Sequence, residues 1–203
     1  MSNPTIRTLV GATAPQKIDR RSTALLVIDF QKEYFSGRMP IPGGTDALAN
    51  ARRLIAMADK SGIQVYHVQH VTPAGAPIFA EDGETVAFHP DITPGPDHKV
   101  LRKSSVSVFP TTDIDAQLKA EGIETLIIAG LMTHACVSGA ARDAVPLGYG
   151  VIVAADACAT RDLDGPDGKT VSHEALHQAA LATLADTFAD VLGTDQILSL
   201  PHA

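Results

Sequence analysis

Short segments that are almost wholly apolar, each about the length of one strand, recur along this chain. Residues 23–29 (TALLVID), 125–130 (TLIIAG) and 150–155 (GVIVAA) together contain a single charged side chain, Asp29. A strand whose successive residues are all apolar is buried on both faces, which is typical of a parallel sheet covered by helices on either side. These three segments therefore predict strands of such a sheet.

The segments between them complete an alternation of strands and helices. Further strands are predicted at residues 63–70, 99–103 and 189–192, and helices at 45–60, 113–121, 135–145 and 171–188. Thr45 is the expected cap of the first helix, which Ser61 and Gly62 end. Strands that alternate with helices join through right-handed crossovers, so we predict one doubly wound α/β sheet. The length suits a single domain over residues 1–203.

Two segments fall outside this pattern. Residues 1–21 are polar and irregular, and we expect an arm packed on the surface. Residues 71–98 are rich in proline and glycine and show no sustained period. A loop of this length inside a compact domain is usually functional or mobile. A plain surface excursion is one interpretation, but Phe79 and Phe88 favour a pocket wall or a contact between subunits.

The charge balance narrows the range of partners. Sixteen Lys and Arg against 23 Asp and Glu give a formal net charge of −7, whereas a nucleic-acid-binding protein needs a basic face. No apolar run approaches the roughly 18 residues of a membrane span, and the first ten residues do not have the pattern of a secretory signal. Two cysteines cannot form a disulfide framework. We therefore expect a reduced, cytoplasmic protein that acts on a small molecule, with no nucleic-acid or membrane partner.

Three side chains of complementary chemistry lie at the predicted strand ends. Asp29 ends the first strand, Lys103 ends the third, and Cys136 opens the helix after the fourth. In an open α/β sheet, ligands bind beyond the carboxyl ends of the strands, where the strand order reverses. If the first and fourth strands are neighbours there, Asp29 and Cys136 face one crevice, and the long side chain of Lys103 reaches across it.

Taken alone, each of the three has an ordinary structural explanation: a loop cap, a solvated lysine and a small buried thiol. Together they fit nucleophilic catalysis. A thiol near a helix N-terminus and beside an ammonium group has a lowered pKa, and a carboxylate can take its proton and later return it to a leaving amine. The turn over residues 130–136 brings backbone N–H groups near the sulfur, and two of them would hold the oxyanion of a tetrahedral intermediate.

Four segments resemble those of the isochorismatase-like cysteine hydrolase superfamily, which includes nicotinamidases and N-carbamoylsarcosine amidohydrolase. They are LLVIDFQ at residues 25–31, KSSVSVF at 103–109, GLMTHACVSGAARDA at 130–144 and ADACAT at 155–160. The resemblance covers roughly residues 20–198, and the combination of segments is specific. It implies a three-layer α/β/α fold with a six-stranded, mostly parallel sheet, a homodimer or homotetramer, and the catalytic triad Asp29, Lys103 and Cys136.

The resemblance also implies a reaction and its supporting groups. A cis peptide bond between Leu131 and Met132 would aim the Met132 N–H into an oxyanion hole that the Cys136 N–H completes. The implied reaction cleaves a C–N bond of a small carboxamide, N-carbamoyl or ureido compound through a thioester and releases ammonia or an amine. Substrate contacts are expected from side chains that follow the strand ends: Tyr34, Phe35, His70, Phe88 and Phe109.

No metal or other cofactor is expected. The metal site of nicotinamidases uses an Asp-x-His pair after the second strand, whereas this chain has His67 and His70, whose side chains point to opposite faces of a strand. No G-x-G-x-x-G follows the first strand, and Gly168-Lys169-Thr170 lies in an acidic loop without the first glycine of a P-loop. The missing Asp of the metal site also weakens nicotinamide as the substrate.

Two other functions stay open. Isochorismatases cleave a vinyl ether and do not need the cysteine, so Cys136 favours an amide or ureide over that substrate. A flavodoxin-like module could instead bind a ligand or sense oxidants through Cys136 without turnover, and Asp29 and Lys103 would then be dispensable. We expect Cys158 to be a small buried thiol rather than a redox partner of Cys136.

Overall fold

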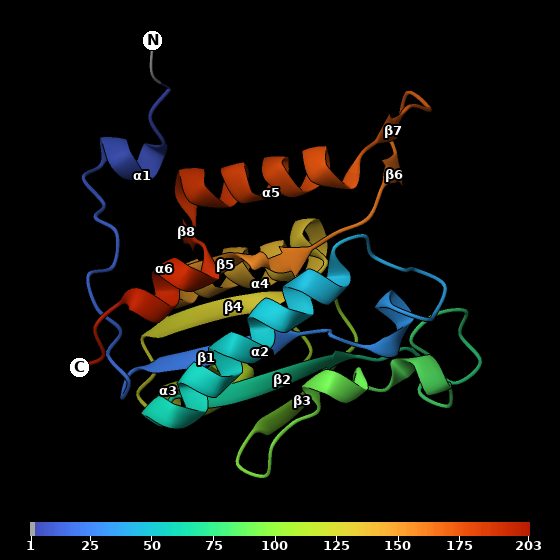
Figure 1. Ribbon diagram of the computed structural model, residues 1–203, viewed down its shortest axis with the longest axis horizontal. Coiled ribbons are helices and arrows are strands. Elements are labelled where there is room, and N and C mark those ends of the chain that lie inside the picture. Colours follow the sequence, from blue (N-terminus) through green and yellow to red (C-terminus); the bar gives the residue numbers. More distant parts are fainter. Residues whose placement is uncertain (1–2) are drawn as a thin grey trace.

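The computed structural model describes residues 3–203 and contains a six-stranded, all-parallel sheet (Figure 1). Its strands are β1 (Thr23–Ile28), β2 (Gln64–His70), β3 (Lys99–Lys103), β4 (Thr125–Leu131), β5 (Gly150–Ala159) and β8 (Asp190–Leu192). Their order is β3-β2-β1-β4-β5-β8, so the direction of winding reverses between β1 and β4. The predicted doubly wound sheet, with its first and fourth strands as neighbours, is confirmed.

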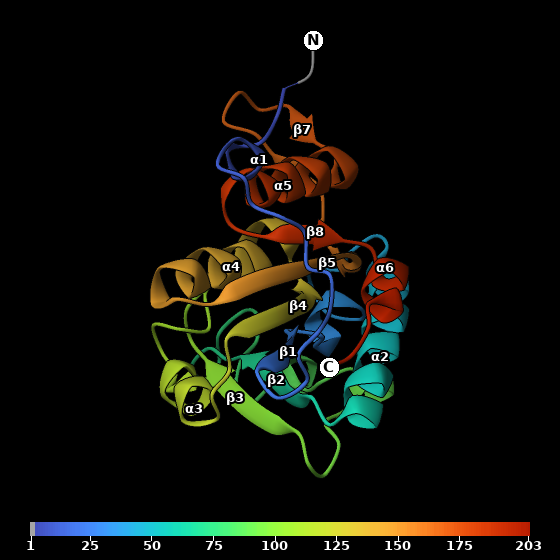
Figure 2. The same ribbon diagram turned by 90° about the vertical axis from the view of Figure 1, so that its left-hand side faces the viewer.

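Helices cover both faces of this sheet and complete the three layers (Figure 2). On one face lie α2 (Gly44–Ser61) and α6 (Thr194–Ser199), on the other α3 (Ile114–Ala120) and α4 (Ser138–Ala144), and α5 (His173–Thr187) packs beside α4 and β8. Successive side chains of β1 point to opposite faces of the sheet. Leu25 and Val27 pack in the apolar cluster under α2, and Leu26 and Ile28 pack in the cluster under α3 and α4. Burial on both faces explains why the strand is apolar throughout.

The predicted elements differ from the structure mainly at their ends. The residue before α2 is Gly43, with a φ of 71°, so the prediction that Thr45 caps this helix is wrong. The helix predicted from residue 135 begins instead as a π-helical turn, η4 (Thr133–Val137), and ends in a 3-10 turn, η5 (Val145–Leu147). β5 extends to Ala159 because it pairs with β4 again after an irregularity in the register.

The two segments outside the sheet pattern are largely irregular. The long loop over residues 71–98 holds two 3-10 turns, η2 (Glu84–Val86) and η3 (Pro90–Ile92). A further 3-10 turn, η1 (Lys32–Tyr34), lies outside these two segments and follows β1. The predicted arm contains a one-turn helix, α1 (Ile6–Leu9), held against α5 by the backbone N–H of Ile6, which donates to Asp186. Residues 1 and 2 of that predicted arm lie outside the described residues.

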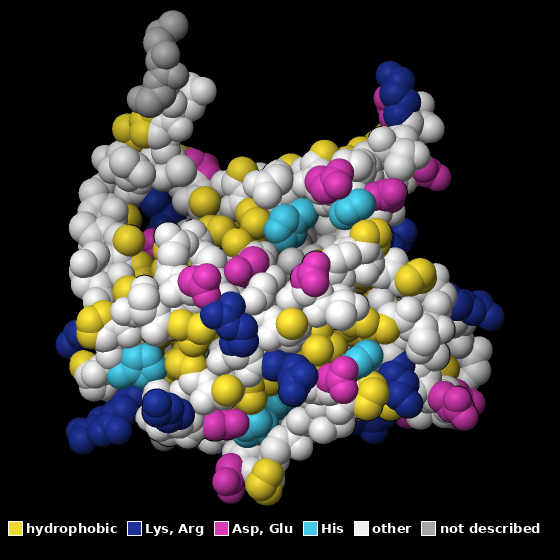
Figure 3. All heavy atoms as spheres, in the orientation of Figure 1, with side chains coloured by type: hydrophobic (Ala, Val, Ile, Leu, Met, Phe, Trp, Pro, Cys, Tyr) yellow, Lys and Arg dark blue, Asp and Glu magenta, His cyan; other side chains and the backbone are white. Residues whose placement is uncertain are grey.

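Charged side chains of both signs are mixed over the face shown in Figure 3. The acidic loop after β5 folds into a two-stranded antiparallel ribbon, β6 (Leu163–Asp164) and β7 (Thr170–Val171), which projects from the body in that view. Within residues 3–203, every helix falls short of the length or the hydropathy needed to cross a membrane.

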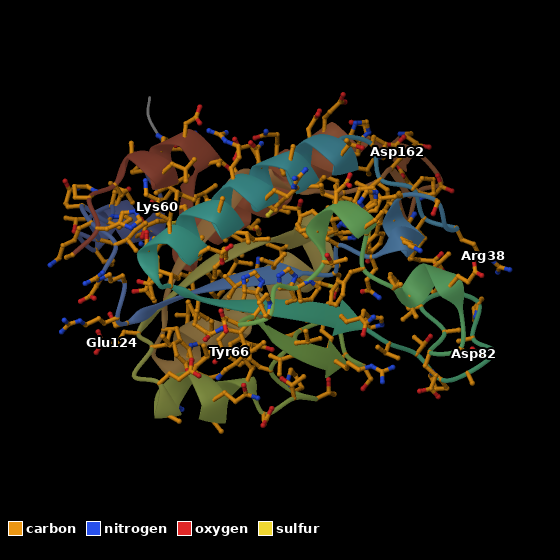
Figure 4. The ribbon with its side chains drawn as sticks, turned by 60° about the horizontal axis from the view of Figure 1, so that its bottom comes forward. Arg38, Lys60, Tyr66, Asp82, Glu124 and Asp162 are labelled. Carbon is orange, nitrogen blue, oxygen red and sulfur yellow. The ribbon has the colours of Figure 1, made fainter. Side chains whose placement is uncertain are left out.

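All six strands point the same way, so their carboxyl ends share one edge of the sheet. Figure 4 labels Arg38, Asp82 and Asp162, in segments that follow β1, β2 and β5, at one end of the molecule. Lys60 and Glu124, which precede β2 and β4, are labelled at the opposite end. The residues that follow the strands therefore gather at the first of these two ends.

Candidate active site

The end of β1 places a carboxyl group inside the molecule. Asp29 follows Ile28 with a φ of 56°, a left-handed conformation that is uncommon for residues other than glycine and that clusters at functional sites. Its backbone N–H donates to the carbonyl of Val68 at 2.9 Å, which holds the turn against β2. The Asp29 side chain is fully buried. Sequence and backbone together thus direct an acid into the sheet edge rather than into solvent.

Lys103, the last residue of β3, reaches this carboxyl group. Its Nζ lies 2.8 Å from Asp29 Oδ2 and 3.3 Å from Cys136 Sγ, and its side chain is buried. Gly130 allows β4 to lie close to β1, because any larger residue would place a Cβ 2.6 Å from the Cβ of Ile28. This close approach helps to bring Cys136, in the turn after β4, near the end of β1. The structure therefore brings together the three residues that the sequence singles out.

The protonation state of Cys136 differs from the sequence-based expectation. Burial raises the pKa of this thiol, the neighbouring Asp29 raises it further, and Lys103 lowers it only in part. The residue lies inside the turn η4 and is 6% exposed, so the loss of water outweighs the effect of the lysine. Burial also raises the pKa of Asp29, against the lowering effect of Lys103. The prediction of a lowered thiol pKa is wrong for the free site, where a neutral thiol stands next to a base.

The backbone at the nucleophile has the predicted unusual bond. The peptide between Leu131 and Met132 is cis. The Met132 carbonyl then accepts the N–H groups of Ala135 at 3.1 Å and Val137 at 3.3 Å, which closes the turn η4. The use of the Met132 and Cys136 N–H groups as an oxyanion hole stays a prediction.

Two of the five predicted substrate contacts lie beside the triad. His70 Nδ1 is 3.0 Å from Lys103 Nζ. Tyr34 is buried, and the pKa of its hydroxyl is raised by burial and then by the nearby Cys136 and Asp29. The ring of Phe79, in the loop 71–98, packs edge-on against Tyr34 at 5.2 Å and against His70 at 5.1 Å between centroids. Phe79 therefore packs against two residues beside the triad, whereas Phe88, the other aromatic residue behind the predicted pocket wall, packs against His67.

The other three predicted contacts pack against other aromatic rings. Their closest aromatic partners are His89 for Phe35 (4.5 Å between centroids), His67 for Phe88 (5.7 Å) and Tyr149 for Phe109 (6.2 Å). His67 projects from β2 toward the α2 face, on the opposite side from His70, so Phe88 lies on that side too. A substrate contact by any of these three rings stays a prediction.

The two histidines of β2 lie in different environments. His67 is buried, its Nε2 lies 3.1 Å from His98 Nδ1, and burial followed by the charge of His98 lowers its pKa to about 4. His70 faces the triad instead. In the part of the chain that the structure describes, no three His, Cys, Asp or Glu side chains converge as metal ligands would.

Cys158 is a second buried thiol in the neighbouring strand. It pairs in register with Gly130, both cysteines are free, and burial raises the pKa of Cys158 to about 12. Lys103 lowers the pKa of Cys136 in part and lies 3.3 Å from its sulfur, whereas no cation is among the groups that shift the pKa of Cys158. These features agree with the expectation of a small buried thiol.

Arg161 is a further candidate that sequence reasoning did not find. Its Nε is buried and has no hydrogen-bond partner among the described residues. The guanidinium lies close enough to Tyr34 and His134 to lower the pKa values of both groups, although burial has the larger effect on each. His134 is two residues from Cys136. A lone arginine in an acidic loop gives no sequence signal, because it is expected to be solvated.

Comparisons with known proteins agree with this architecture. The sequence matches the isochorismatase domain over residues 23–196. The isochorismatase family protein YddQ of Bacillus subtilis is 37% identical over 179 residues, which cover 87% of this chain and 99% of the relative. Maleamate amidohydrolase of Pseudomonas putida is 29% identical, with 85% and 83% covered. The crystal structure of an isochorismatase from Pseudomonas putida KT2440 superposes with a TM-score of 0.87 at 33% identity and covers 97% of this chain and 100% of its own.

Proposed function

The chain belongs to the isochorismatase family of hydrolases, and from this premise we propose that it is a cysteine amidohydrolase acting on a small carboxamide, N-carbamoyl or ureido compound. The observation that carries the proposal is the contact of Lys103 Nζ with both Asp29 Oδ2 (2.8 Å) and Cys136 Sγ (3.3 Å) in a buried site. A nucleophile, a base and a cation at these distances suit acyl transfer. Hydrolysis of a vinyl ether needs no thiol, and an amidohydrolase among the relatives favours the amide.

The reaction follows from the protonation states of the free site. Asp29 takes the proton of the Cys136 thiol as the sulfur attacks the carbonyl carbon, and Lys103 stabilises the negative sulfur. The N–H groups of Met132 and Cys136 then hold the oxyanion. Collapse breaks the C–N bond, Asp29 returns its proton to the leaving ammonia or amine, and a thioester remains. Asp29 next takes a proton from water as the water oxygen attacks the thioester carbonyl. The C–S bond breaks, the free acid leaves, and Asp29 returns this proton to the sulfur of Cys136.

Arg161 supports a narrower substrate class. A buried guanidinium N–H without a partner is costly, and a carboxylate on the substrate would accept it. We therefore propose that the substrate carries a carboxylate a few bonds from the scissile amide. Such a molecule would span the distance between Cys136 and Arg161.

A panel of paired compounds tests this function. Each pair consists of an amide or ureide that bears a carboxylate and its neutral methyl ester, and the measurement is release of ammonia or amine. We expect turnover of at least one acidic member and weaker turnover of its ester. Release of ammonia from no member, together with hydrolysis of a vinyl ether, would favour the isochorismatase reaction. Reversible oxidation of Cys136 without any turnover would favour the redox-sensing alternative.

Substitution of Arg161 gives a separate prediction. Arg161→Gln should raise KM for the acidic substrate by about 10- to 100-fold and leave its ester nearly unaffected, because a charge-assisted hydrogen bond contributes about 1.5–3 kcal/mol. Steady-state kinetics on both members of the pair measure this. An equal loss for both members would show that Arg161 does not read the carboxylate. The Arg38→Gln variant, which changes an arginine of the segment after β1, is the control.

The remaining expectations stay predictions. They are a homodimer or homotetramer, a cytoplasmic location, a single domain over residues 1–203, and the absence of a cofactor.

A further inference from the structure

The ammonium group of Lys103 faces more acceptors than it has hydrogens. Its Nζ lies 2.8 Å from Asp29 Oδ2, 3.0 Å from His70 Nδ1, 3.1 Å from the Ser105 carbonyl oxygen and 3.3 Å from Cys136 Sγ. An ammonium group donates three hydrogen bonds and accepts none. At any moment, therefore, at least one of the four acceptors lacks a full hydrogen bond from Lys103.

This arrangement fixes the state of His70. Because Lys103 only donates, Nδ1 of the imidazole carries a lone pair and the ring proton is on Nε2. Burial and then the charge of Lys103 lower the pKa of His70, while Asp29 and the Ser105 carbonyl act in the opposite direction. The ring of Phe79, which does not titrate, packs on another side. A second proton on the ring would turn its acceptor into a donor facing a cation.

The imidazole is anchored by the segment that carries the carboxylate. The backbone N–H of His70 donates to Gln31 Oε1 at 2.8 Å, and Gln31 Nε2 donates to the His70 carbonyl at 2.8 Å. Gln31 is fully buried and also donates to the carbonyl of Val86 at 2.7 Å. His70 is the register partner of Lys103 in the sheet. Strand pairing and Gln31 together set the imidazole against the ammonium group.

We propose that His70 is a positioning residue for Lys103, a role that rests on the hydrolase function proposed above. His70 Nδ1 and the Ser105 carbonyl accept two N–H bonds throughout the reaction, which leaves one N–H for Asp29 and Cys136 in turn. When the thiol proton moves to Asp29, the neutral carboxyl becomes the weaker acceptor, and this N–H turns to the thiolate. Without the imidazole, Lys103 has a free N–H and no fixed direction toward the sulfur.

Alkylation of Cys136 by iodoacetamide tests the role without any substrate. The rate is followed by mass spectrometry from about pH 5 to about pH 9, which brackets the ordinary pKa values of His and Cys. His70→Asn keeps an acceptor near the position of Nδ1 but does not titrate, and His70→Ala removes the acceptor. Gln69→Ala is the matched control, because it loses a hydrogen bond from the same strand to the Val86 carbonyl (2.9 Å) and does not touch Lys103.

At pH 8 we expect alkylation rates within about threefold for the wild-type, His70→Asn and Gln69→Ala proteins, and a rate at least about tenfold lower for His70→Ala, since the thiolate fraction follows the nearby cation. As the pH falls, the wild-type rate should drop more steeply than the His70→Asn rate, because only the imidazole takes a proton. With a substrate, His70→Ala should lower kcat, and His70→Asn should restore most of it.

Three results would overturn the proposal. One is a His70→Ala rate equal to that of wild type at every pH, and another is a His70→Ala enzyme in which only KM rises, as a plain substrate contact predicts. If His70→Ala does not fold, His70→Gln replaces it, because the amide oxygen of Gln lies near the position of Nε2 and not of Nδ1. The third contradicting result is then alkylation of Cys136 in His70→Gln at the same rate as in His70→Asn. Failure of the wild-type protein to hydrolyse any amide would contradict the proposed function alone, because alkylation still reports on Lys103.

Discussion

Replacing Cys136 with alanine is expected to lower amide hydrolysis by at least about 10⁴-fold, in the range found when the nucleophile of a catalytic triad is removed. In the proposed mechanism the thiol carries the acyl intermediate, so the variant lacks the covalent step. The side chain is small and 6% exposed, and its loss should change the melting temperature little. Release of ammonia and circular dichroism measure the two effects on the same samples.

The chain offers a matched control in Cys158. This thiol is 5% exposed, belongs to the neighbouring strand and packs in the same core cluster as Cys136. Cys158→Ala should retain activity within about twofold, because surface or core changes away from the site act mainly on stability. Mass spectrometry of acid-quenched wild-type enzyme should also find the acyl group on Cys136. Turnover that survives in Cys136→Ala, or an acyl group on Cys158, contradicts the mechanism.

The sequence predicts the central strands of this fold well because both faces of each strand are buried and must therefore be apolar. Each residue of β1 is buried, on one face or the other, so the strand is legible as an unbroken apolar run. The positions of Asp29 and Lys103 then follow from strand ends, and that of Cys136 from the turn after β4. Three residues far apart in sequence could be joined in one site because parallel strands deliver their ends to one edge.

The parts that escaped prediction depend on contacts that form only in the folded chain. The extension of β5 past its predicted end arises from renewed pairing of Cys158 with Gly130 after an irregularity, which no local pattern encodes. That extension also carries the chain to Arg161, a residue without any sequence signal. The raised pKa of Cys136 is of the same kind: a helix N-terminus and a lysine can be inferred from spacing, but the loss of water can be judged only once the packing is known.

The buried pair of Asp29 and Lys103 gives the largest expected effect on stability. Lys103→Met leaves a fully buried carboxylate without its counter-ion, beside the Cys136 thiol, which is only a weak hydrogen-bond donor. Breaking a buried ion pair in this way costs about 3–5 kcal/mol of unfolding free energy. Asp29→Asn should cost less, because the ammonium group keeps His70 Nδ1 and the Ser105 carbonyl as acceptors. Urea unfolding of the single variants measures this order.

The double variant separates the pair from its parts. Asp29→Asn combined with Lys103→Met removes both charges, so its unfolding free energy should lie within about 1.5 kcal/mol of wild type, since neutral replacements of buried ion pairs are often tolerated. All three variants should lack activity. A double variant as unstable as Lys103→Met would mean that the lost free energy comes from packing of the lysine chain and not from an unpaired carboxylate.

The loss of unfolding free energy in Lys103→Met should also depend on pH, and the titration of Asp29 decides whether it grows or shrinks as the pH rises. Burial raises the pKa of this carboxyl even beside the lysine, and removal of the lysine takes away the main opposing effect. The folded state then holds a proton that the unfolded state, with an Asp pKa near 3.9, has already released. Stability is therefore greatest at low pH and falls as the pH rises through the folded pKa. Unfolding of Lys103→Met should be closer to wild type at pH 5 than at pH 8, whereas the double variant should show no such trend, because it has no carboxyl group at this position to titrate.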